Sequence, residues 1–350
     1  MAEAPKAPEG ASYENSTLAE VAEFIRDGRT FAVCGHINPD GDCLGSVLAM
    51  TALLRSMGKE CAPLLANTMP APRKYAYLAG FDEFKRALHY KKTPDVFISV
   101  DTPVVERMGE SKPVMNRARK NVSIDHHPGV GIGAMVTHCD THAASASMIV
   151  WELAKELVGE PPVEVAEACF AGLLTDTGRF QFQNTDARCL AAAGEMVAAG
   201  TDPARAATEI FQNRPLPAIQ LEGRVIERTR LTPGGLVSYS WIDNADYEEL
   251  GARKEDTEGL VDVLRSVEGV EVAVLIRGRE TDVRCSIRAK RDVDVAAIAE
   301  GFGGGGHRAA AGFNIECSLA EGIERVAEAM AEVERALLEG KPLPTFGDSE

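Results

Sequence analysis

Short apolar runs alternate with amphipathic stretches along the first half of the chain. Four apolar runs are expected to form buried strands: residues 30–36, 61–66, 95–101 and 121–127. Apolar residues at helical spacing predict helices at residues 44–58, 144–159 and 162–178, with a further helical stretch around 186–212. Strands that alternate with helices indicate βαβ units, so the pattern predicts an α/β domain with a mostly parallel sheet and helices on both faces.

The pattern changes in the second part of the chain, after two closely spaced prolines in residues 213–220. Strands are predicted at residues 235–242, 270–278 and 282–290, and amphipathic helices at 256–267 and 318–340. These elements predict a smaller α/β domain with a mixed sheet. The expected organisation is a disordered tail (1–16), a first domain (17–212), a linker (213–228), a second domain (229–342) and a tail (343–350).

Composition narrows the classes of function. The formal net charge is −16, and affinity for long duplexes comes largely from basic side chains, so long nucleic acid is a poor partner. A short anionic substrate fits if positive charge is focused locally. No apolar run approaches the roughly 20 residues that span a bilayer, so no membrane is expected. The 8 cysteines form no CxxC pair, which indicates reduced thiols and a cytoplasmic protein.

Acidic and imidazole side chains gather where predicted strands end. His36 closes the first strand, and Asp40 and Asp42 follow in a turn before a helix. Two carboxylates in a turn are as often an Asx turn and a helix cap, but a histidine within reach favours a metal. Asp101 closes the strand at residues 95–101, where a plain capping residue is the alternative.

Two further sites complete the pattern. Asp125, His126 and His127 end the strand at 121–127, and Asp176 interrupts an apolar helix, where an unpaired carboxylate would be costly. The carboxyl ends of parallel strands meet at one edge of a sheet, so we expect these side chains to converge. Repulsion between clustered carboxylates is relieved by divalent cations. Two such ions sharing one carboxylate form the clamp used for phosphoryl displacement.

This series of an Asp-x-Asp turn, a strand-end Asp, an Asp-His-His motif and a helical Asp resembles the DHH phosphoesterase superfamily. The stretch FGGGGHRAAAGF at residues 302–313 resembles the glycine-rich signature of the DHH-associated second domain. The resemblance covers residues 20–335. The length and the spelling HINPDGDCLGS are similar to the branch of oligoribonucleases and 3′-phosphoadenosine 5′-phosphate phosphatases.

The resemblance implies two metal ions, with Mn²⁺ the expected ion and Mg²⁺, Co²⁺ or Zn²⁺ as alternatives. His36 and Asp40 would hold one ion, and Asp101 would bridge the pair. The remaining ligands of the second ion would be Asp42, His126 and Asp176.

Five residues are implied to act in catalysis: Asp42, Asp101, Asp125, His126 and His127. Asp125 would orient a histidine from behind, and His127 would contact the scissile phosphate or tune the solvent between the ions. His138 and His142, in contrast, are expected in loop or capping roles.

A basic region of the second domain is the expected substrate site. Alternation along residues 282–290 places Arg284, Ser286 and Arg288 on one face of a strand, for which a solvated polar face is the alternative reading. Glycines permit close approach of backbone amides to an anion. The resemblance favours a phosphate-binding or nucleotide-binding role for Arg284, Ser286, Arg288, Gly304, Gly305, Gly306 and His307.

The expected function is metal-dependent hydrolysis of short oligoribonucleotides and 3′-phosphoadenosine 5′-phosphate, with water activated by two ions. A phosphodiesterase for linear or cyclic dinucleotides is the first alternative. A non-catalytic nucleotide-binding regulatory protein is the second, from another class. A homodimer is implied by the resemblance alone.

Overall fold

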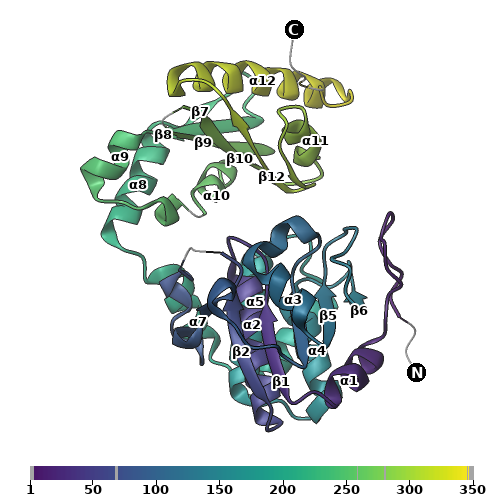
Figure 1. Ribbon diagram of the computed structural model, residues 1–350. Helices are drawn as coiled ribbons and strands as arrows, with labels where there is room; N and C mark the ends of the chain where they lie inside the picture. The colour runs from purple at the N-terminus through teal and green to yellow at the C-terminus, as the bar shows by residue number, and fades with distance from the viewer. Residues whose placement is uncertain (1–3, 68–69, 258, 280, 345, 347–350) are drawn as a thin grey trace. The chain divides into compact units, whose positions relative to one another are not determined.

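The computed structural model describes residues 4–67, 70–257, 259–279, 281–344 and 346 (Figure 1). The chain divides into two compact units, residues 1–213 and 214–350, each with its own core. Both units are α/β, as the alternating pattern predicts.

The first unit is built on a six-stranded parallel sheet with the order β3-β2-β1-β4-β5-β6. Its strands are β1 (Thr30–Cys34), β2 (Glu60–Leu65), β3 (Lys85–Arg86), β4 (Val96–Val100), β5 (Lys120–Asp125) and β6 (Val136–Cys139). The predicted parallel sheet is confirmed. The two edge strands, β3 and β6, were not predicted, because each is too short to give an apolar run of its own.

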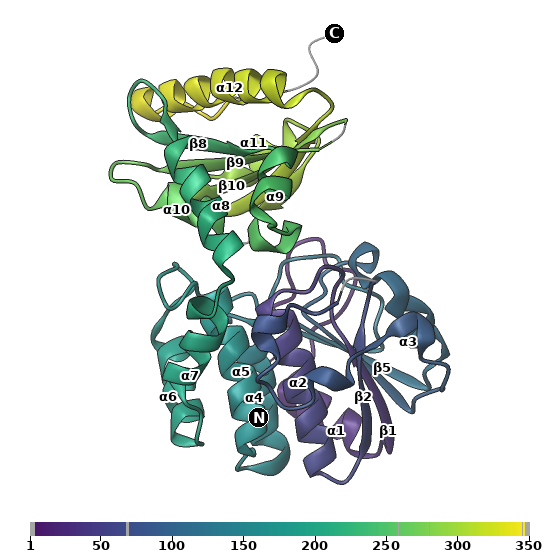
Figure 2. The same cartoon turned by 90° about the vertical axis from the view of Figure 1, so that its left-hand side faces the viewer.

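Helices cover both faces of this sheet (Figure 2). They are α1 (Leu18–Arg26), α2 (Gly41–Ser56), α3 (Lys112–Arg117), α4 (Ala146–Val158), α5 (Val163–Asp176), α6 (Ala187–Ala198) and α7 (Pro203–Ala207). Along β1, Phe31 and Val33 pack beneath α1, α2, α4 and α5, whereas Ala32 and Cys34 face α3. This alternation explains why the strand reads as continuously apolar: both of its faces are buried.

The helical stretch expected over 186–212 is divided in three. After α6 the chain turns at Gly200, whose φ of 113° lies in the region open to glycine. Helix α7 then begins at Pro203 and leads into a π-helical turn, Thr208–Gln212.

The N-terminal segment is ordered where we expected a disordered tail. Residues 1–3 lie outside the described part, but the side chain of Asn15 makes two hydrogen bonds with the backbone of Cys139: Nδ2 donates to the carbonyl (2.6 Å), and Oδ1 accepts from the amide (2.7 Å). The Ser16 amide also donates to Thr137 (2.7 Å). An amide side chain can mimic a neighbouring strand in this way, and Asn15 thereby satisfies the open edge of β6.

The second unit contains a mixed six-stranded sheet with the order β11-β12-β10-β9-β8-β7. Its strands are β7 (Arg230–Leu231), β8 (Val237–Ile242), β9 (Val272–Gly278), β10 (Val283–Ala289), β11 (Gly305–His307) and β12 (Ala310–Ile315). Strands β8 and β9 are parallel, and the other pairs are antiparallel.

Two helical layers enclose this second sheet. The helices are α8 (Leu216–Glu227), α9 (Asn244–Leu250), α10 (Leu260–Arg265), α11 (Val295–Glu300) and α12 (Leu319–Glu339). Helices α11 and α12 pack on the face that carries Val274 and Cys285, whereas α8 and α10 pack on the face that carries Ala273 and Leu275. Within the described residues, no helix is long and apolar enough to cross a membrane.

The linker expected at residues 213–228 is mostly helix α8. Leu221 and Val225 of this helix are fully buried in the second unit. The prolines that suggested a linker stand at the N-cap (Pro215) and in the first turn (Pro217) of α8. A proline fits there because the first-turn amides have no helical acceptor to lose.

The bonds of Asn15 lead to a stability prediction. Asn15→Ala should lower the free energy of unfolding by about 1–3 kcal/mol, because it leaves the two backbone groups of Cys139 without their partners. Urea denaturation followed by tryptophan fluorescence measures the change. Asn213→Ala is a matched control, because the side chain of exposed Asn213 bonds to Glu209 alone among the described residues. Equal losses in the two variants would contradict the prediction.

Candidate metal centre

The strand ends of the first sheet bring four of the expected side chains to one edge. Asp101 follows β4 directly, and Asp125 is the last residue of β5. His36 follows the end of β1, and His126 follows Asp125. Because β1, β4 and β5 are adjacent and parallel, their carboxyl ends lie together.

Two helices supply the remaining carboxylates. Asp40 caps α2, accepting a hydrogen bond from the Cys43 amide (3.0 Å), and Asp42 lies in the first turn of the same helix. Asp176 is the last residue of α5. The helices approach closely beside the site: a Cβ at Gly172 would lie 2.8 Å from Asp42 Oδ1. A glycine at this position therefore makes room for the Asp42 carboxylate.

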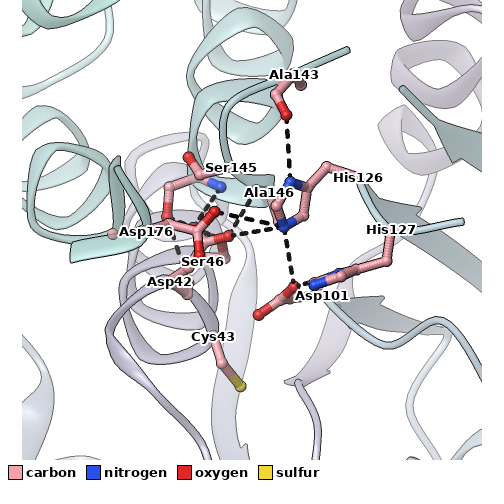
Figure 3. Close-up of polar contacts among 12 residues, drawn as sticks. Asp42, Cys43, Ser46, Asp101, His126, His127, Ala143, Ser145, Ala146 and Asp176 are labelled. Carbon is pink, nitrogen blue, oxygen red and sulfur yellow. Dashed lines mark hydrogen bonds and ion pairs between the residues drawn. The ribbon is translucent and has the colours of Figure 1, made fainter. Parts of the chain in front are cut away.

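The cluster has two halves. In the first, His36 Nε2 lies 3.4 Å from Asp101 Oδ2 and 3.7 Å from Asp40 Oδ2. In the second, His126 Nε2 lies 3.7 Å from both Asp42 Oδ2 and Asp101 Oδ1, and 3.8 Å from Asp176 Oδ2 (Figure 3). The six residues expected as metal ligands are therefore brought together.

Asp101 belongs to both halves. One of its carboxylate oxygens faces His36 and the other faces His126, and the side chain is only 2% exposed. Its φ of 54° lies in the left-handed region, which costs most residues energy but which aspartate tolerates better than others. Its amide donates to the carbonyl of Ile124 on β5 (2.9 Å). The backbone thus turns sharply at the end of β4 and places this carboxylate between the two histidines.

Both histidines are oriented by carbonyl groups behind them. The Nδ1 atom of His36 lies 2.7 Å from the Ile37 carbonyl, and that of His126 lies 3.2 Å from the Ala143 carbonyl. An Nδ1–H that donates to a carbonyl leaves the lone pair on Nε2, which is the usual arrangement of a metal-bound imidazole.

A divalent cation fits this donor set. Among the described residues, His126 Nε2 and Asp101 Oδ1 are buried without a hydrogen-bond partner of acceptable geometry. Buried polar atoms of this kind are costly unless something satisfies them. Imidazole nitrogens with carboxylate oxygens suit Mn²⁺, Fe²⁺, Co²⁺ or Zn²⁺. The two halves therefore provide places for two ions that share Asp101.

Sequence reasoning missed what holds Asp42 in place. Its Oδ2 accepts a hydrogen bond from the Ala146 amide (2.6 Å), and its Oδ1 accepts one from the Ser147 amide (2.8 Å). These amides form the first turn of α4, whose positive end favours a carboxylate. The sequence signal was weak: Ser145 marks the start of the helix, but nothing local shows which carboxylate meets its free amides.

Asp125 and His127 form a second layer beside Asp101. Asp125 Oδ1 accepts hydrogen bonds from the amides of His126 (2.7 Å) and His127 (2.9 Å) and lies 2.9 Å from His127 Nδ1. His127 Nδ1 is also 3.2 Å from Asp101 Oδ1. Asp125 is thus placed to orient His127. The backbone of residues 125–127 turns sharply around the Asp125 carboxylate.

Mutual repulsion and burial perturb the acids and histidines of this cluster. Burial, reinforced by Asp42 and opposed by His126, raises the pKa of Asp176 to about 8. Burial alone would lower the pKa of His36, but contacts with Asp101 and Asp40 outweigh it and raise this pKa to about 10. Protons on these groups therefore offset negative charge that bound cations would otherwise neutralise.

His138 and His142 belong to none of the possible metal-ligand groups among the described residues. His138 is not in a loop but in strand β6, where its Nδ1 lies 2.6 Å from the Ser16 carbonyl, because the N-terminal segment covers that edge. The His142 amide donates to Asp140 in a turn (3.0 Å).

The buried thiol of Cys43, which was not expected at the site, lies within 4.8 Å of ligand atoms of His36 and Asp101. The thiol also fills the space that a Cβ at Gly35 would need.

The residues expected to bind substrate lie in the second unit. Arg284, Ser286 and Arg288 share one face of β10, as predicted by alternation. Within the glycine run, Gly305 and Gly306 are paired in β11 with β12. A Cβ at Gly304 would lie 2.3 Å from the Gly312 carbonyl, so glycine here permits close strand packing. The side chain of His307 lies outside the described part of the structure.

Each of the two units matches a known family of protein domains. Residues 30–174 match the DHH family N-terminal domain, and residues 236–339 match the DHHA1 domain. A bifunctional oligoribonuclease and PAP phosphatase NrnA from Thermus thermophilus is 32% identical over 331 residues, which is 93% of this chain and 96% of the relative. The chain belongs to the DHH family.

Two further similarities extend along this DHH chain. The Bacillus subtilis bifunctional oligoribonuclease and PAP phosphatase NrnA is 28% identical, over 80% of this chain and 87% of the relative. The crystal structure of an exopolyphosphatase-related protein from Bacteroides fragilis has a TM-score of 0.85 at 21% identity, covering 92% of this chain and 97% of the other. The last similarity shows a shared fold across both units.

The pKa shifts lead to a prediction for metal binding by this DHH chain. At pH 7 the carboxyl of Asp176 and the ring of His36 carry protons, since their pKa values are about 8 and about 10. A bound cation must displace these protons, so Mn²⁺ binding should release them, and its affinity should increase with rising pH. Titration calorimetry in two buffers of different ionisation enthalpy measures the number of protons released when Mn²⁺ binds.

The Asp176→Asn variant serves as the comparison, because its amide has no proton to lose. It should release fewer protons than the unchanged chain on binding Mn²⁺. Proton release that stays the same in this variant, or an affinity independent of pH, would contradict the assignment of Asp176 as a ligand.

Proposed function

We propose that this chain is a hydrolase that cleaves short oligoribonucleotides and 3′-phosphoadenosine 5′-phosphate with two divalent metal ions, Mn²⁺ being the expected species. The observation that carries the proposal is the double cluster in which Asp101 faces His36 with one oxygen and His126 with the other. The NrnA relatives are named for these two activities, and one of them matches nearly the whole length of the chain.

The ligand assignments follow the two halves of the cluster. His36 and Asp40 would hold one ion, with Asp101 contributing to both positions. The second ion would be held by Asp42, His126 and Asp176. When bound, a pair of such ions lowers the pKa of water and offsets the charge that develops on the phosphoryl group.

The residues around the ligands contribute orientation. The α4 amides hold the Asp42 carboxylate, so its free lone pairs point at the cluster. Asp125 fixes the ring of His127 beside Asp101, where the imidazole can contact the phosphate of a substrate. A ligand set held by the fold needs little rearrangement during the reaction, and this preorganisation lowers the barrier.

The choice of short substrates is supported by charge. A net charge of −16 disfavours the binding of long strands, whose affinity comes largely from basic side chains. Positive charge is concentrated instead on β9 and β10 of the second unit. A cytoplasmic location and a homodimer remain part of the proposal.

Replacing the shared carboxylate tests the metal pair. Asp101→Asn keeps the shape of the side chain and tolerates the left-handed backbone, but it removes the charge between the histidines. We expect Mn²⁺-dependent hydrolysis to fall by more than about 100-fold, because even indirect partners of metal ligands cost 10–100-fold. Asp82→Asn is the control, since Asp82 is an exposed partner of Arg73. Wild-type turnover in Asp101→Asn would refute the two-metal proposal.

A substrate screen decides between the expected activity and its alternatives. Turnover of 3′-phosphoadenosine 5′-phosphate, a five-residue RNA, and linear and cyclic dinucleotides is compared with Mn²⁺ under one condition. The proposal expects the first two substrates to be hydrolysed fastest. A clear preference for a cyclic dinucleotide would replace it with the phosphodiesterase reading. Binding without hydrolysis of any substrate would favour a regulatory protein.

A further inference from the structure

An additional arginine, Arg277, stands beside the expected substrate face of the second unit. It lies on β9 directly opposite Arg284 on β10 in the antiparallel register. Ser286 and Arg288 follow on the same face of β10, with Leu275 and Ala273 as their cross-strand partners. Leu275 and Ala273 are packed beneath α8 and α10, so the arginines continue the face that these helices partly cover.

The three arginines on this face form no ion pair among the described residues, and Asp262 acts on Arg288 only from beyond ion-pair distance. Among the described residues, no carboxylate lies within ion-pair distance of Arg277, Arg284 or Arg288. Nearby arginines are different: Arg279 pairs with Asp282 (3.1 Å), and Arg291 pairs with Glu271. Arg277 and Arg288 are partly buried, whereas Arg284 is exposed. Partly buried charges are normally paired, so the two partly buried guanidinium groups indicate that an anion from outside the chain neutralises them.

The side chain of Arg277 is fixed in position. Its Nη1 donates to Thr257 Oγ1 (3.2 Å), and its Nη2 donates to Ser286 Oγ. Its Nε is buried and has no hydrogen-bond partner within the described part of the chain. Burial and the neighbouring Arg284 lower the pKa of Arg277, although a guanidinium remains protonated.

Contact with Arg277 also affects Ser286. Because Ser286 Oγ accepts a hydrogen bond from Arg277, its own proton is free to be donated to an acceptor from a ligand. Arg277 thus orients a hydroxyl donor and adds a positive charge to the same small area. Phosphate oxygens are the acceptors best matched by guanidinium and hydroxyl donors together.

We propose that Arg277 makes this face selective for a terminal phosphate monoester over an internal phosphodiester. The inference rests on the proposed function, because it concerns the substrate site of the same enzyme. A phosphate monoester carries a charge of about −1.5 to −2 at pH 7 and three acceptor oxygens, whereas a phosphodiester carries one charge. Three arginines without an ion-pair partner therefore favour the terminal phosphate monoester. Arg277 on β9 adds a third positive charge to the two that Arg284 and Arg288 provide on β10.

Binding of two ligands that differ by one phosphate tests this selectivity. The ligands are the dinucleoside monophosphate ApA, which has only a diester, and 5′-phosphorylated pApA. Titration calorimetry on the full chain with a chelator present measures affinity without hydrolysis. We expect the unchanged chain to bind pApA more tightly than ApA. Arg277→Gln should lower pApA affinity by about tenfold or more, the loss of one charge-assisted hydrogen bond, and leave ApA affinity within about twofold.

Two variants act as comparisons. Arg279→Gln removes a neighbouring arginine that is already paired with Asp282, so the preference for pApA should remain. Arg277→Lys keeps the charge but cannot contact both Thr257 and Ser286, so it should retain part of the preference. The ApA affinity of each variant reports whether its second unit is folded.

The outcomes separate this inference from the proposed function. Loss of the preference in Arg277→Gln but not in Arg279→Gln supports the inference, whatever the hydrolysis assays show. An unchanged preference in Arg277→Gln, or an equal loss in Arg279→Gln, overturns it while leaving metal-dependent hydrolysis in the first unit untouched. Full preference for pApA in Arg277→Lys, with ApA affinity unchanged, would make charge alone decisive and would overturn the role assigned to the Ser286 contact.

Discussion

The burial of several carboxylates at one point is the constraint on which the first unit depends. Asp42 and Asp101 are almost completely buried, and both carboxylates lie 3.7 Å from Nε2 of the same imidazole ring, that of His126. Such an arrangement is unfavourable unless positive charge is present. The fold contributes by holding the acids rigidly, with strand ends, the close packing of α2 on α5 and the amides of α4. Cations would then convert a repulsive cluster into a strong binding site.

The sequence predicted the parts of this arrangement that follow from strand direction. Buried strands ending in His36, Asp101 and Asp125 were recognisable from apolar runs, and parallel pairing then required their ends to meet. The convergence of Asp176 with them was predicted from its place in an apolar helix. These inferences succeeded because each rests on a local pattern and one general rule of sheet topology.

Features that depend on contacts between distant segments could not be predicted in the same way. Asn15 reads as a polar residue of a tail, and only the open edge of β6 gives its amide two partners. The prolines of residues 213–220 fit a linker as well as the start of α8, and the burial of Leu221 decides between them. Arg277 likewise ends an apolar strand, and its place beside Arg284 and Ser286 becomes visible only with the register of β9 on β10.

The bond between Asp42 and the start of α4 has a consequence for the order of folding. The carboxylate belongs to the first turn of α2, whereas the amides that hold it come from residues more than 100 positions later in the chain. The second half of the cluster therefore cannot assemble until α4 has docked. A metal ion is then unable to nucleate this unit in the way zinc nucleates a small finger. Metal uptake would instead be a late event that reports a completed tertiary structure.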